Sequence, residues 1–191
     1  MKTLVLIAAA GRGRRFGGDK RRARLGDGTL LMATHARAGQ CFADVRVILR
    51  ADDRPAELGL PDQGVLVSRR ADQGLGASLS DGFAALLAEP EPAPVAAVWL
   101  GDMPWVDPAT VSALLAEAGP GRIVRPTLDG APGFPVLFGR DFWPALAANT
   151  ESDGARAVIR RHRPALVEIP VSDPGVLRDV DRPADLTDAD I

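Results

Sequence analysis

The feature that most constrains the fold is an uninterrupted apolar run at residues 4–9, followed by a glycine- and arginine-rich loop at residues 11–28. Such a run of strand length is typical of a parallel strand that is buried on both faces. Glycines after such a strand let the backbone turn several N–H groups toward one point, where they can bind phosphate oxygens. We therefore expect an anion-binding loop at the carboxyl edge of a parallel sheet.

The same N-terminal run has an alternative interpretation as a signal peptide, because Met1 and Lys2 precede it and three alanines end it. A signal peptide usually extends over about 15–30 residues. Here the apolar run ends at Ala10 and arginines follow, so a buried first strand is the better interpretation. The predicted location is cytoplasmic, and no membrane partner is expected because no apolar run has the length of a membrane-spanning helix.

Strands and helices alternate as far as residue 122. Strands are expected at residues 4–9, 45–49, 64–67 and 95–100, and helices at 29–42, 76–88 and 107–119. This alternation predicts an α/β fold, a Rossmann-like three-layer α/β/α arrangement with a mostly parallel central sheet. The remainder predicts a small β excursion at 123–126 and 134–138, a helix around 152–161 and a last strand at 166–171. A length of 191 residues predicts a single domain, 1–191.

Composition excludes several classes of function. The single cysteine and two histidines rule out a disulfide framework and a zinc site built from Cys and His. The formal net charge of −2 argues against a protein that coats nucleic acid, which would usually be strongly basic. The candidate chemistry therefore lies in carboxylates, arginines, lysines and backbone groups.

The glycine-rich loop fails the spacing of two familiar phosphate-binding motifs. A P-loop needs Lys and then Ser or Thr directly after its second glycine, but Gly18 is followed by Asp19. In the dinucleotide fingerprint, Phe16 stands where the third glycine belongs, and the acids Asp52 and Asp53 at the end of the second strand lie too far away. The loop is therefore either a phosphate-binding loop of a different type, which the glycines and cations favour, or a mobile arginine-rich loop without a ligand.

Positive charge follows these glycines. Arg15 and Lys20 would suit a triphosphate, and seven cations in all lie between Arg12 and Arg24. Two other interpretations stay open for this cluster: a solvated loop, or a docking site for a polyanionic second substrate. The loop is expected to be polar and exposed, so that a change at Lys20 would affect turnover rather than folding.

Asp102 is the leading candidate for a metal ligand. It follows the expected strand 95–100 almost directly, so its carboxylate should project at the carboxyl edge of the sheet. Mg²⁺ prefers one or two carboxylates together with phosphates and waters. The alternative is that Asp102 caps a helix, but Asp107 before Pro108 already supplies that cap.

Six segments in order resemble the motifs of the MobA-like NTP transferase family. They are residues 9–20, 73–79 with Gly82, 100–104, 133–138, 153–156 and 179–186. The chain departs from the family pattern at Ala8, at Phe134, at Glu151 and Ser152, and at Arg182 and Ala184. Within the family, Ala10 resembles the cytidylyl-transferring members, which join CTP to the terminal phosphate of molybdopterin. The guanylyl-transferring relatives usually carry Gly there.

The resemblance implies a fold of the nucleotide-diphospho-sugar transferase type and Mg²⁺-dependent transfer of CMP from CTP to molybdopterin, with release of pyrophosphate. The implied nucleotide-binding residues are Ala9, Ala10, Gly11, Gly13, Arg15, Lys20, Gly74, Gly76 and Ser78. Catalytic roles are implied for Arg15, Lys20 and Asp102, with Asp102 and Asp181 holding the metal. For the segment 73–78, an ordinary helix N-terminus is the open alternative.

The choice of the second metal ligand lies between Asp179 and Asp181. Alternation before Pro183 places both on one side of the chain with Val180 opposite, whereas Asp185 lies in a helical first turn. Asp181 is favoured because it matches the second acid of the family's pattern.

Alternatives remain open for the partners. They are GTP as donor, another phosphorylated acceptor, or a non-catalytic accessory protein of molybdenum enzymes. A transient contact with a molybdenum enzyme is a further expected partner interaction.

Overall fold

The computed structural model describes residues 2–13, 16–149 and 154–186. Most strands belong to one mixed sheet with the order β10-β7-β9-β6-β1-β4-β5, and β8 pairs with β7 at one end. Their bounds are β1 Thr3–Ala8, β4 Asp44–Arg50, β5 Val65–Ser68, β6 Val95–Leu100, β7 Ile123–Leu128, β8 Ala131–Pro132, β9 Val136–Gly139 and β10 Leu166–Pro170. The short strands β2 (Arg24–Leu25) and β3 (Gly28–Thr29) pair separately.

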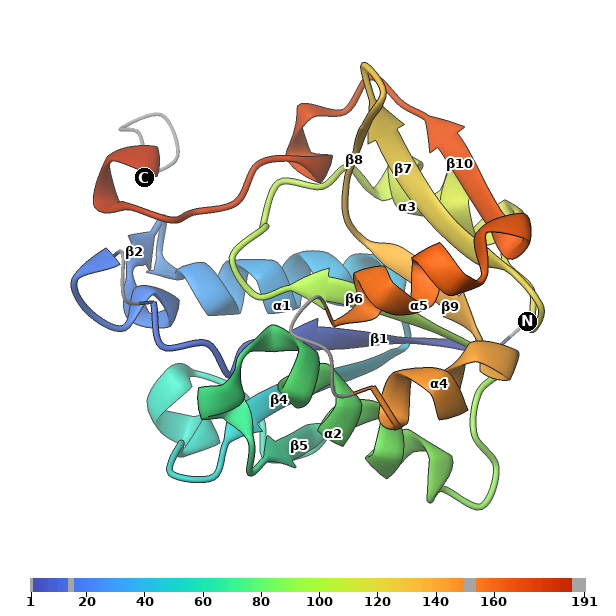
Figure 1. Cartoon of the computed structure of the whole chain (residues 1–191). Helices are drawn as coiled ribbons and strands as arrows, with labels where there is room; N and C mark the ends of the chain where they lie inside the picture. The colour runs from blue at the N-terminus through green and yellow to red at the C-terminus, as the bar shows by residue number, and fades with distance from the viewer. Residues whose placement is uncertain (1, 14–15, 150–153, 187–191) are drawn as a thin grey trace.

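The sheet is mostly parallel, as the sequence predicts. β1 pairs in parallel with both β4 and β6, while β9 is antiparallel to β6 and β7. The predicted β excursion is therefore the part that inserts an antiparallel strand between β6 and β7. Because β1 lies between two parallel neighbours, its carboxyl end and that of β6 meet at the same edge of the sheet (Figure 1).

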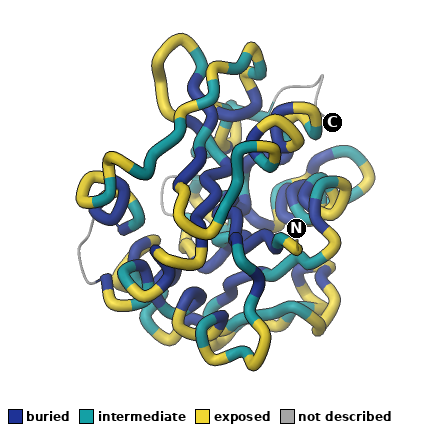
Figure 2. Tube along the Cα trace, turned by 90° about the vertical axis from the view of Figure 1, so that its right-hand side faces the viewer, coloured by how far each residue is buried: buried dark blue, intermediate teal, exposed yellow. Residues whose placement is uncertain are grey.

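Helices cover both faces of the sheet and complete three layers (Figure 1). Helix α1 (Leu30–Cys41) and helix α3 (Pro108–Ala116) lie on one face, and α2 (Leu75–Leu87), α4 (Trp143–Ala147) and α5 (Ala155–Arg161) lie on the other. Alternate residues of β1 serve the two layers: Val5 and Ile7 pack with the α1 side, Leu4 and Leu6 with the α2 side. Figure 2 shows the resulting buried centre, with the exposed residues toward the outside of the molecule.

The helix caps that the sequence predicts are present. The Thr29 side chain accepts a hydrogen bond from the amide of Met32 at the start of α1. Asp107 accepts one from Ala109 at 2.8 Å at the start of α3, with Pro108 in the first turn. Asp107 and not Asp102 is therefore the cap of α3.

The short strands β2 and β3 were not predicted, and two helices differ from the expectation. Helix α4 follows a single 3-10 turn at Arg140–Phe142 and was not predicted, although Pro144 near its start is a helix-initiating signal. The helix expected around 152–161 begins at Ala155 in the structure, and Ser152 lies outside the described residues. In the described part of the chain, no helix combines the length and apolar character needed to cross a membrane.

The C-terminal segment returns from β10 along the carboxyl edge of the sheet toward α1 (Figure 1). Its Val180 is fully buried, packs with Leu25 and Leu30, and donates its amide to the carbonyl of Asp102 at 3.2 Å. This segment has no strand assignment, but the alternation expected around Val180 holds, because Asp179 is exposed and Asp181 is half-buried on either side of it. The segment therefore carries both acids to the end of β6.

Candidate active site

A cleft of about 570 Å³ lies at the carboxyl ends of β1 and β6, bounded by the loop after β1 and by the start of α2. We call it the first cleft. Most of the residues expected to bind nucleotide or metal line it, namely Ala9, Ala10, Gly11, Gly13, Lys20, Gly74, Ser78, Asp102 and Asp181. The fold therefore brings four segments that are far apart in the sequence together at this cleft.

Three of the expected residues fall elsewhere or take another contact. Arg15 lies outside the described residues. Gly76 lines a second cleft next to the first, where its Cα lies close to Gly154. Ser78 is buried, and its hydroxyl donates to the carbonyl of Gly74 at 3.3 Å, so part of its hydrogen-bonding capacity serves the helix start.

The backbone at the rim of the first cleft requires glycine. Gly13 has a φ of +57° and Gly74 a φ of +103°, a region that residues with a side chain rarely adopt. A Cβ at Gly13 would also lie 3.0 Å from the carbonyl oxygen of Gly18. Because no side chain caps the start of α2, its first amides can donate to a ligand in the cleft.

Three carboxylates meet at the end of β6. Oxygen atoms of Asp102, Asp179 and Asp181 lie within 4.8 Å of one another. The Oδ1 atom of Asp102 is buried and has no hydrogen-bond partner among the described residues. An unsatisfied buried carboxylate oxygen is costly unless a cation or donor reaches it, so the cluster fits a divalent cation with oxygen ligands.

Burial also affects the pKa of Asp102. Burial raises the pKa of Asp102, and the Lys20 ammonium opposes this rise, while the negative charge of Asp179 adds to it. Only 13% of the Asp102 side chain is exposed. A positive charge at the site would favour the ionised carboxylate.

Lys20 reaches the acids directly. Its ammonium contacts Oδ2 of Asp102, donates to the carbonyl of Val180 at 2.9 Å and lies 3.6 Å from Asp181. The expectation of an exposed loop is wrong at this position, because only 19% of the Lys20 side chain is exposed. Buried carboxylates attract the ammonium inward, where it lies between the loop and the acid cluster.

This contact changes what Lys20→Ala should do. We expect turnover to fall by about 10²–10³-fold through loss of a charge at the reacting phosphates. We also expect the free energy of unfolding to drop by about 1–3 kcal/mol, because Asp102 loses its charged hydrogen-bond partner. Steady-state kinetics and urea denaturation measure the two effects. Wild-type turnover in the folded variant would exclude a role for Lys20 in catalysis.

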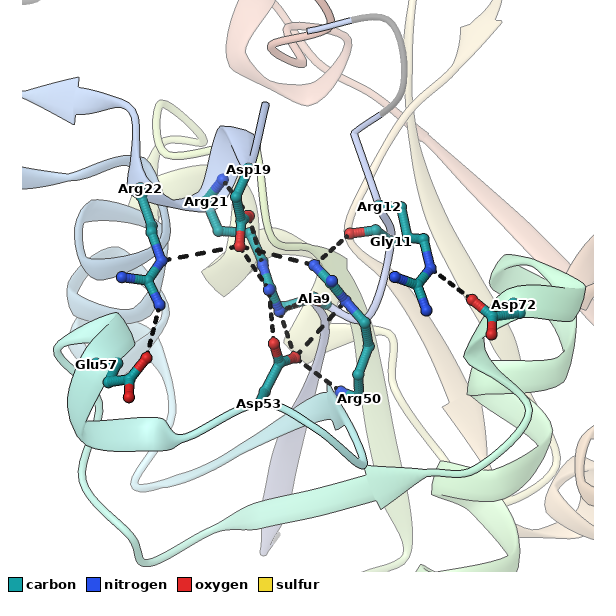
Figure 3. A network of polar contacts seen from close by, with 10 residues as sticks. All are labelled: Ala9, Gly11, Arg12, Asp19, Arg21, Arg22, Arg50, Asp53, Glu57 and Asp72. Atoms are coloured by element: carbon teal, nitrogen blue, oxygen red, sulfur yellow. Dashed lines mark hydrogen bonds and ion pairs between the residues drawn. The ribbon is translucent and has the colours of Figure 1, made fainter. Parts of the chain in front are cut away.

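The neighbouring Arg21 has a role that the sequence did not reveal. Its side chain is only 5% exposed and its guanidinium lies between two carboxylates, 2.7 Å from Asp19 and 2.5 Å from Asp53 (Figure 3). It also donates to the carbonyl of Ala9 at 3.0 Å. Asp53 in turn accepts from the amide of Arg50 at 2.9 Å. This network ties the loop to the ends of β1 and β4.

Asp19, Arg21 and Asp53 each stabilise the charged form of their partner. Burial works to raise the pKa of Asp53, but hydrogen bonds and charge from Arg21 outweigh it and hold that pKa below its usual value. The pKa of Asp19 is lowered by the same balance. Burial works to lower the pKa of Arg21, and the two carboxylates outweigh it, so this arginine stays charged.

Four of the seven cations of the loop, Arg12, Lys20, Arg21 and Arg22, form ion pairs, while Arg14 and Arg15 lie outside the described residues. Arg12 pairs with Asp72 at 2.5 Å across the rim of the first cleft, and Arg22 pairs with Glu57 at 3.1 Å (Figure 3). With Arg21 and Lys20, these residues place much of the positive charge in ion pairs with acids from other loops. The position of Asp53 in the sequence could have indicated this contact. Asp53 follows β4, which is parallel to β1, so it lies at the same carboxyl edge of the sheet as the loop after β1.

Comparison with known proteins shows the family of the chain. The sequence profile described as the MobA-like NTP transferase domain matches residues 5–166. Rv0371c from Mycobacterium tuberculosis is 27% identical, with a TM-score of 0.82, and the match covers 97% of this chain and 95% of that one. A structure of that protein in complex with manganese matches at 26% identity and a TM-score of 0.78, over 97% of this chain and 96% of that one.

A more distant structure shares the fold. Molybdopterin-guanine dinucleotide biosynthesis protein A from Archaeoglobus fulgidus is 17% identical, with a TM-score of 0.72, and the match covers 98% of this chain and 96% of that one. No curated protein matches the chain by sequence. The nucleotide-diphospho-sugar transferase type of fold is confirmed, and the family profile spans the loop, the acid at the end of β6 and most of the sheet. The chain therefore belongs to the MobA-like NTP transferase family, and its chemistry is nucleotidyl transfer.

Proposed function

We propose that the protein transfers CMP from CTP to the terminal phosphate of molybdopterin, with Mg²⁺ as cofactor and pyrophosphate as the second product. The family membership and the order of the six motifs support nucleotidyl transfer, and Ala10 supports the cytidylyl form. The named role of the Archaeoglobus relative in molybdopterin-guanine dinucleotide biosynthesis supports a molybdopterin acceptor.

One observation carries the proposal. The glycine-rich loop after β1 and two of the three clustered carboxylates, Asp102 and Asp181, line the same cleft, and Lys20 reaches from the loop to both of them. Transfer from a nucleoside triphosphate needs backbone donors for its phosphates, ligands for a divalent cation and a positive charge near the leaving pyrophosphate. The loop offers the donors, the carboxylates offer the ligands, and Lys20 offers the charge.

The reaction requires positioning rather than proton abstraction. An acceptor phosphate oxygen is already an anion, so it can attack the α-phosphorus without a general base. The loop amides and Lys20 hold the triphosphate in line, and Asp102 with Asp181 would hold the cation. When bound, Mg²⁺ neutralises charge that develops on the phosphate oxygens. The network around Arg21 keeps the loop fixed to β1 and β4, which reduces the reorganisation needed during transfer.

Asp181 is proposed as the second metal ligand, since it lines the first cleft beside Lys20 whereas Asp179 is more exposed. We expect Asp181→Asn to raise the Mg²⁺ concentration needed for half-maximal activity and to lower turnover by about 10²-fold, while the fold survives. Asp179→Asn, the matched control, should change both quantities much less. Measuring activity over a range of Mg²⁺ concentrations distinguishes the two variants. If Asp179→Asn has the larger effect, Asp179 is the second metal ligand.

The nucleotide preference gives an independent prediction. Ala10 lines the first cleft and is almost fully buried, so its methyl group narrows the cleft beside the loop. We expect CTP to bind more tightly than GTP by about 1–3 kcal/mol, and Ala10→Gly to reduce this difference. Calorimetric titration with both nucleotides in Mg²⁺ measures it. Equal or tighter binding of GTP would point to guanylyl transfer.

The proposal as a whole is tested by pyrophosphate release. The protein is incubated with Mg²⁺, molybdopterin and each of the four ribonucleoside triphosphates in turn. Release with CTP that depends on molybdopterin supports the proposal. Release only with GTP, or only with a different phosphorylated acceptor, replaces the donor or the acceptor. Binding of molybdopterin without any release would indicate an accessory protein.

A further inference from the structure

Arg50, the last residue of β4, reaches the loop after β1 with its side chain (Figure 3). Its Nη2 atom donates a hydrogen bond to the carbonyl of Gly11 at 3.3 Å. The side chain is only 13% exposed, and it does not line the first cleft, whereas Gly11 and Arg12 do. The guanidinium therefore contacts the loop from the side that faces away from the cleft.

Two carboxylates lie beside this guanidinium. Its Nε atom is 3.7 Å from Asp53 and its Nη2 atom is 3.7 Å from Asp19, and both distances are longer than a hydrogen bond. The Nε atom is buried and has no hydrogen-bond partner among the described residues. Because a buried donor without a partner is costly, the two acids alone do not explain where the guanidinium lies. Its hydrogen bond to Gly11 does.

The hydrogen bond to Gly11 also sets the direction of the next amide. The peptide that joins Gly11 to Arg12 is trans, so its carbonyl and its N–H group point in opposite directions. With the carbonyl turned toward Arg50, the amide of Arg12 is turned away from it, toward the cleft. Since Gly11 has no side chain, its own backbone restricts rotation of this peptide less than another residue would.

We propose that Arg50 is a positioning residue for the triphosphate. By binding the carbonyl of Gly11, it keeps the amide of Arg12 directed at a phosphate group in the first cleft. This inference rests on the proposed binding of a nucleoside triphosphate in that cleft. A backbone donor that already points at the phosphate needs no reorganisation during transfer, which is where such donors contribute most.

The charges around Arg50 favour this role over direct attraction of the phosphates. The buried network holds two arginines, Arg21 and Arg50, and two carboxylates, Asp19 and Asp53. The formal charges of these four groups balance, so together they add little positive potential to the cleft. Arg50 therefore acts through the loop that it holds.

The test measures phosphate binding without turnover. The probe is inorganic tripolyphosphate with Mg²⁺, and the comparison is cytidine, which carries no phosphate. The backbone amide signals of the protein are followed by NMR during titration with each. We expect tripolyphosphate to shift the amide signal of Arg12 in the wild type. Absence of that shift would overturn the inference, whatever the variants show.

Three variants separate position from charge and from folding. Arg50→Met should weaken tripolyphosphate binding about tenfold and reduce the shift of the Arg12 amide, with cytidine binding unchanged. Arg50→Lys keeps the charge but not the planar fork, and should weaken binding about fivefold. Arg46→Met is the matched control and should bind like the wild type, because Arg46 lies on the same strand, pairs with Asp44 and does not line the cleft.

The outcomes are distinct. Wild-type affinity in Arg50→Met, full recovery in Arg50→Lys, or an equal loss in Arg46→Met would overturn the inference. So would an equal loss of cytidine and tripolyphosphate binding, which would indicate a purely structural role. If Arg50→Met does not fold, the Arg12 amide of the wild type and the affinity of Arg50→Lys still decide. If tripolyphosphate binds as expected but CTP releases no pyrophosphate with any acceptor, the proposed function fails while the role of Arg50 stands.

Discussion

Replacement of Asp102 by asparagine is expected to lower turnover by about a thousandfold, which corresponds to about 4 kcal/mol of transition-state stabilisation. The amide keeps the shape of the side chain but removes the charge that would hold the cation. The buried, unpartnered Oδ1 atom and the nearby acids Asp179 and Asp181 single out this position. Steady-state kinetics over a range of Mg²⁺ concentrations should show that added metal restores little of the loss.

The fold should tolerate this change. Burial raises the pKa of Asp102, so its ionised form is costly to the folded state, and the neutral amide removes that cost while weakening the contact with Lys20. We expect thermal unfolding to stay near that of the wild type. Asp107→Asn is the matched control, because Asp107 caps α3 outside the cleft and Asn is an equally good cap. If both variants lost activity equally, the assignment of Asp102 would be wrong.

The largest effect on stability is expected from Arg21→Met. Removing one partner of a buried ion pair leaves uncompensated carboxylates and costs about 3–5 kcal/mol. Arg21 is only 5% exposed and lies between Asp19 and Asp53. The matched control is Arg22→Met, because Arg22 is 51% exposed and its pair with Glu57 should be worth about 0–1 kcal/mol. Urea denaturation at neutral pH gives both values.

The same network predicts how stability depends on pH. The pKa values of Asp19 and Asp53 are lowered in the folded state, where Arg21 outweighs the effect of burial. Their stabilising contribution is therefore fully present above the unfolded-state pKa of about 4 and is lost as the pH falls through the folded-state values. The difference between wild type and Arg21→Met should shrink as the pH is lowered from 7 toward about 3. A constant difference, or a loss equal to that of Arg22→Met, would show that the network does not stabilise the loop.

Most of the fold could be predicted from local patterns. The apolar runs that form β1 and β6 are continuous because these strands are buried on both faces, and β4 carries a shorter buried run, Val47 to Leu49. Thr29 and Asp107 mark helix starts through their cap chemistry. The short helix α4 was not predicted because five residues are too few to show the periodic spacing of apolar residues that marks a helix.

The site could be predicted only in part for a similar reason. The glycine-rich loop and Asp102 follow their strands directly, so their place at the sheet edge could be inferred from the chain order. The pairing of Arg21 with Asp53 joins loops that are far apart in sequence, and no spacing rule connects them. The inward position of Lys20 depends on Val180 carrying the C-terminal segment across the end of β6. Neither contact leaves a local signal.

This protein is proposed to transfer the nucleotidyl group of a triphosphate that binds in the first cleft. The most direct test follows two radiolabels, one on the α-phosphorus and one on the γ-phosphorus of CTP, during incubation with Mg²⁺ and molybdopterin. We expect the α label to appear in the acceptor and the γ label in pyrophosphate, and Asp102→Asn to slow the appearance of both by about a thousandfold. Appearance of the γ label in the acceptor, or release of free CMP without labelled acceptor, would contradict it.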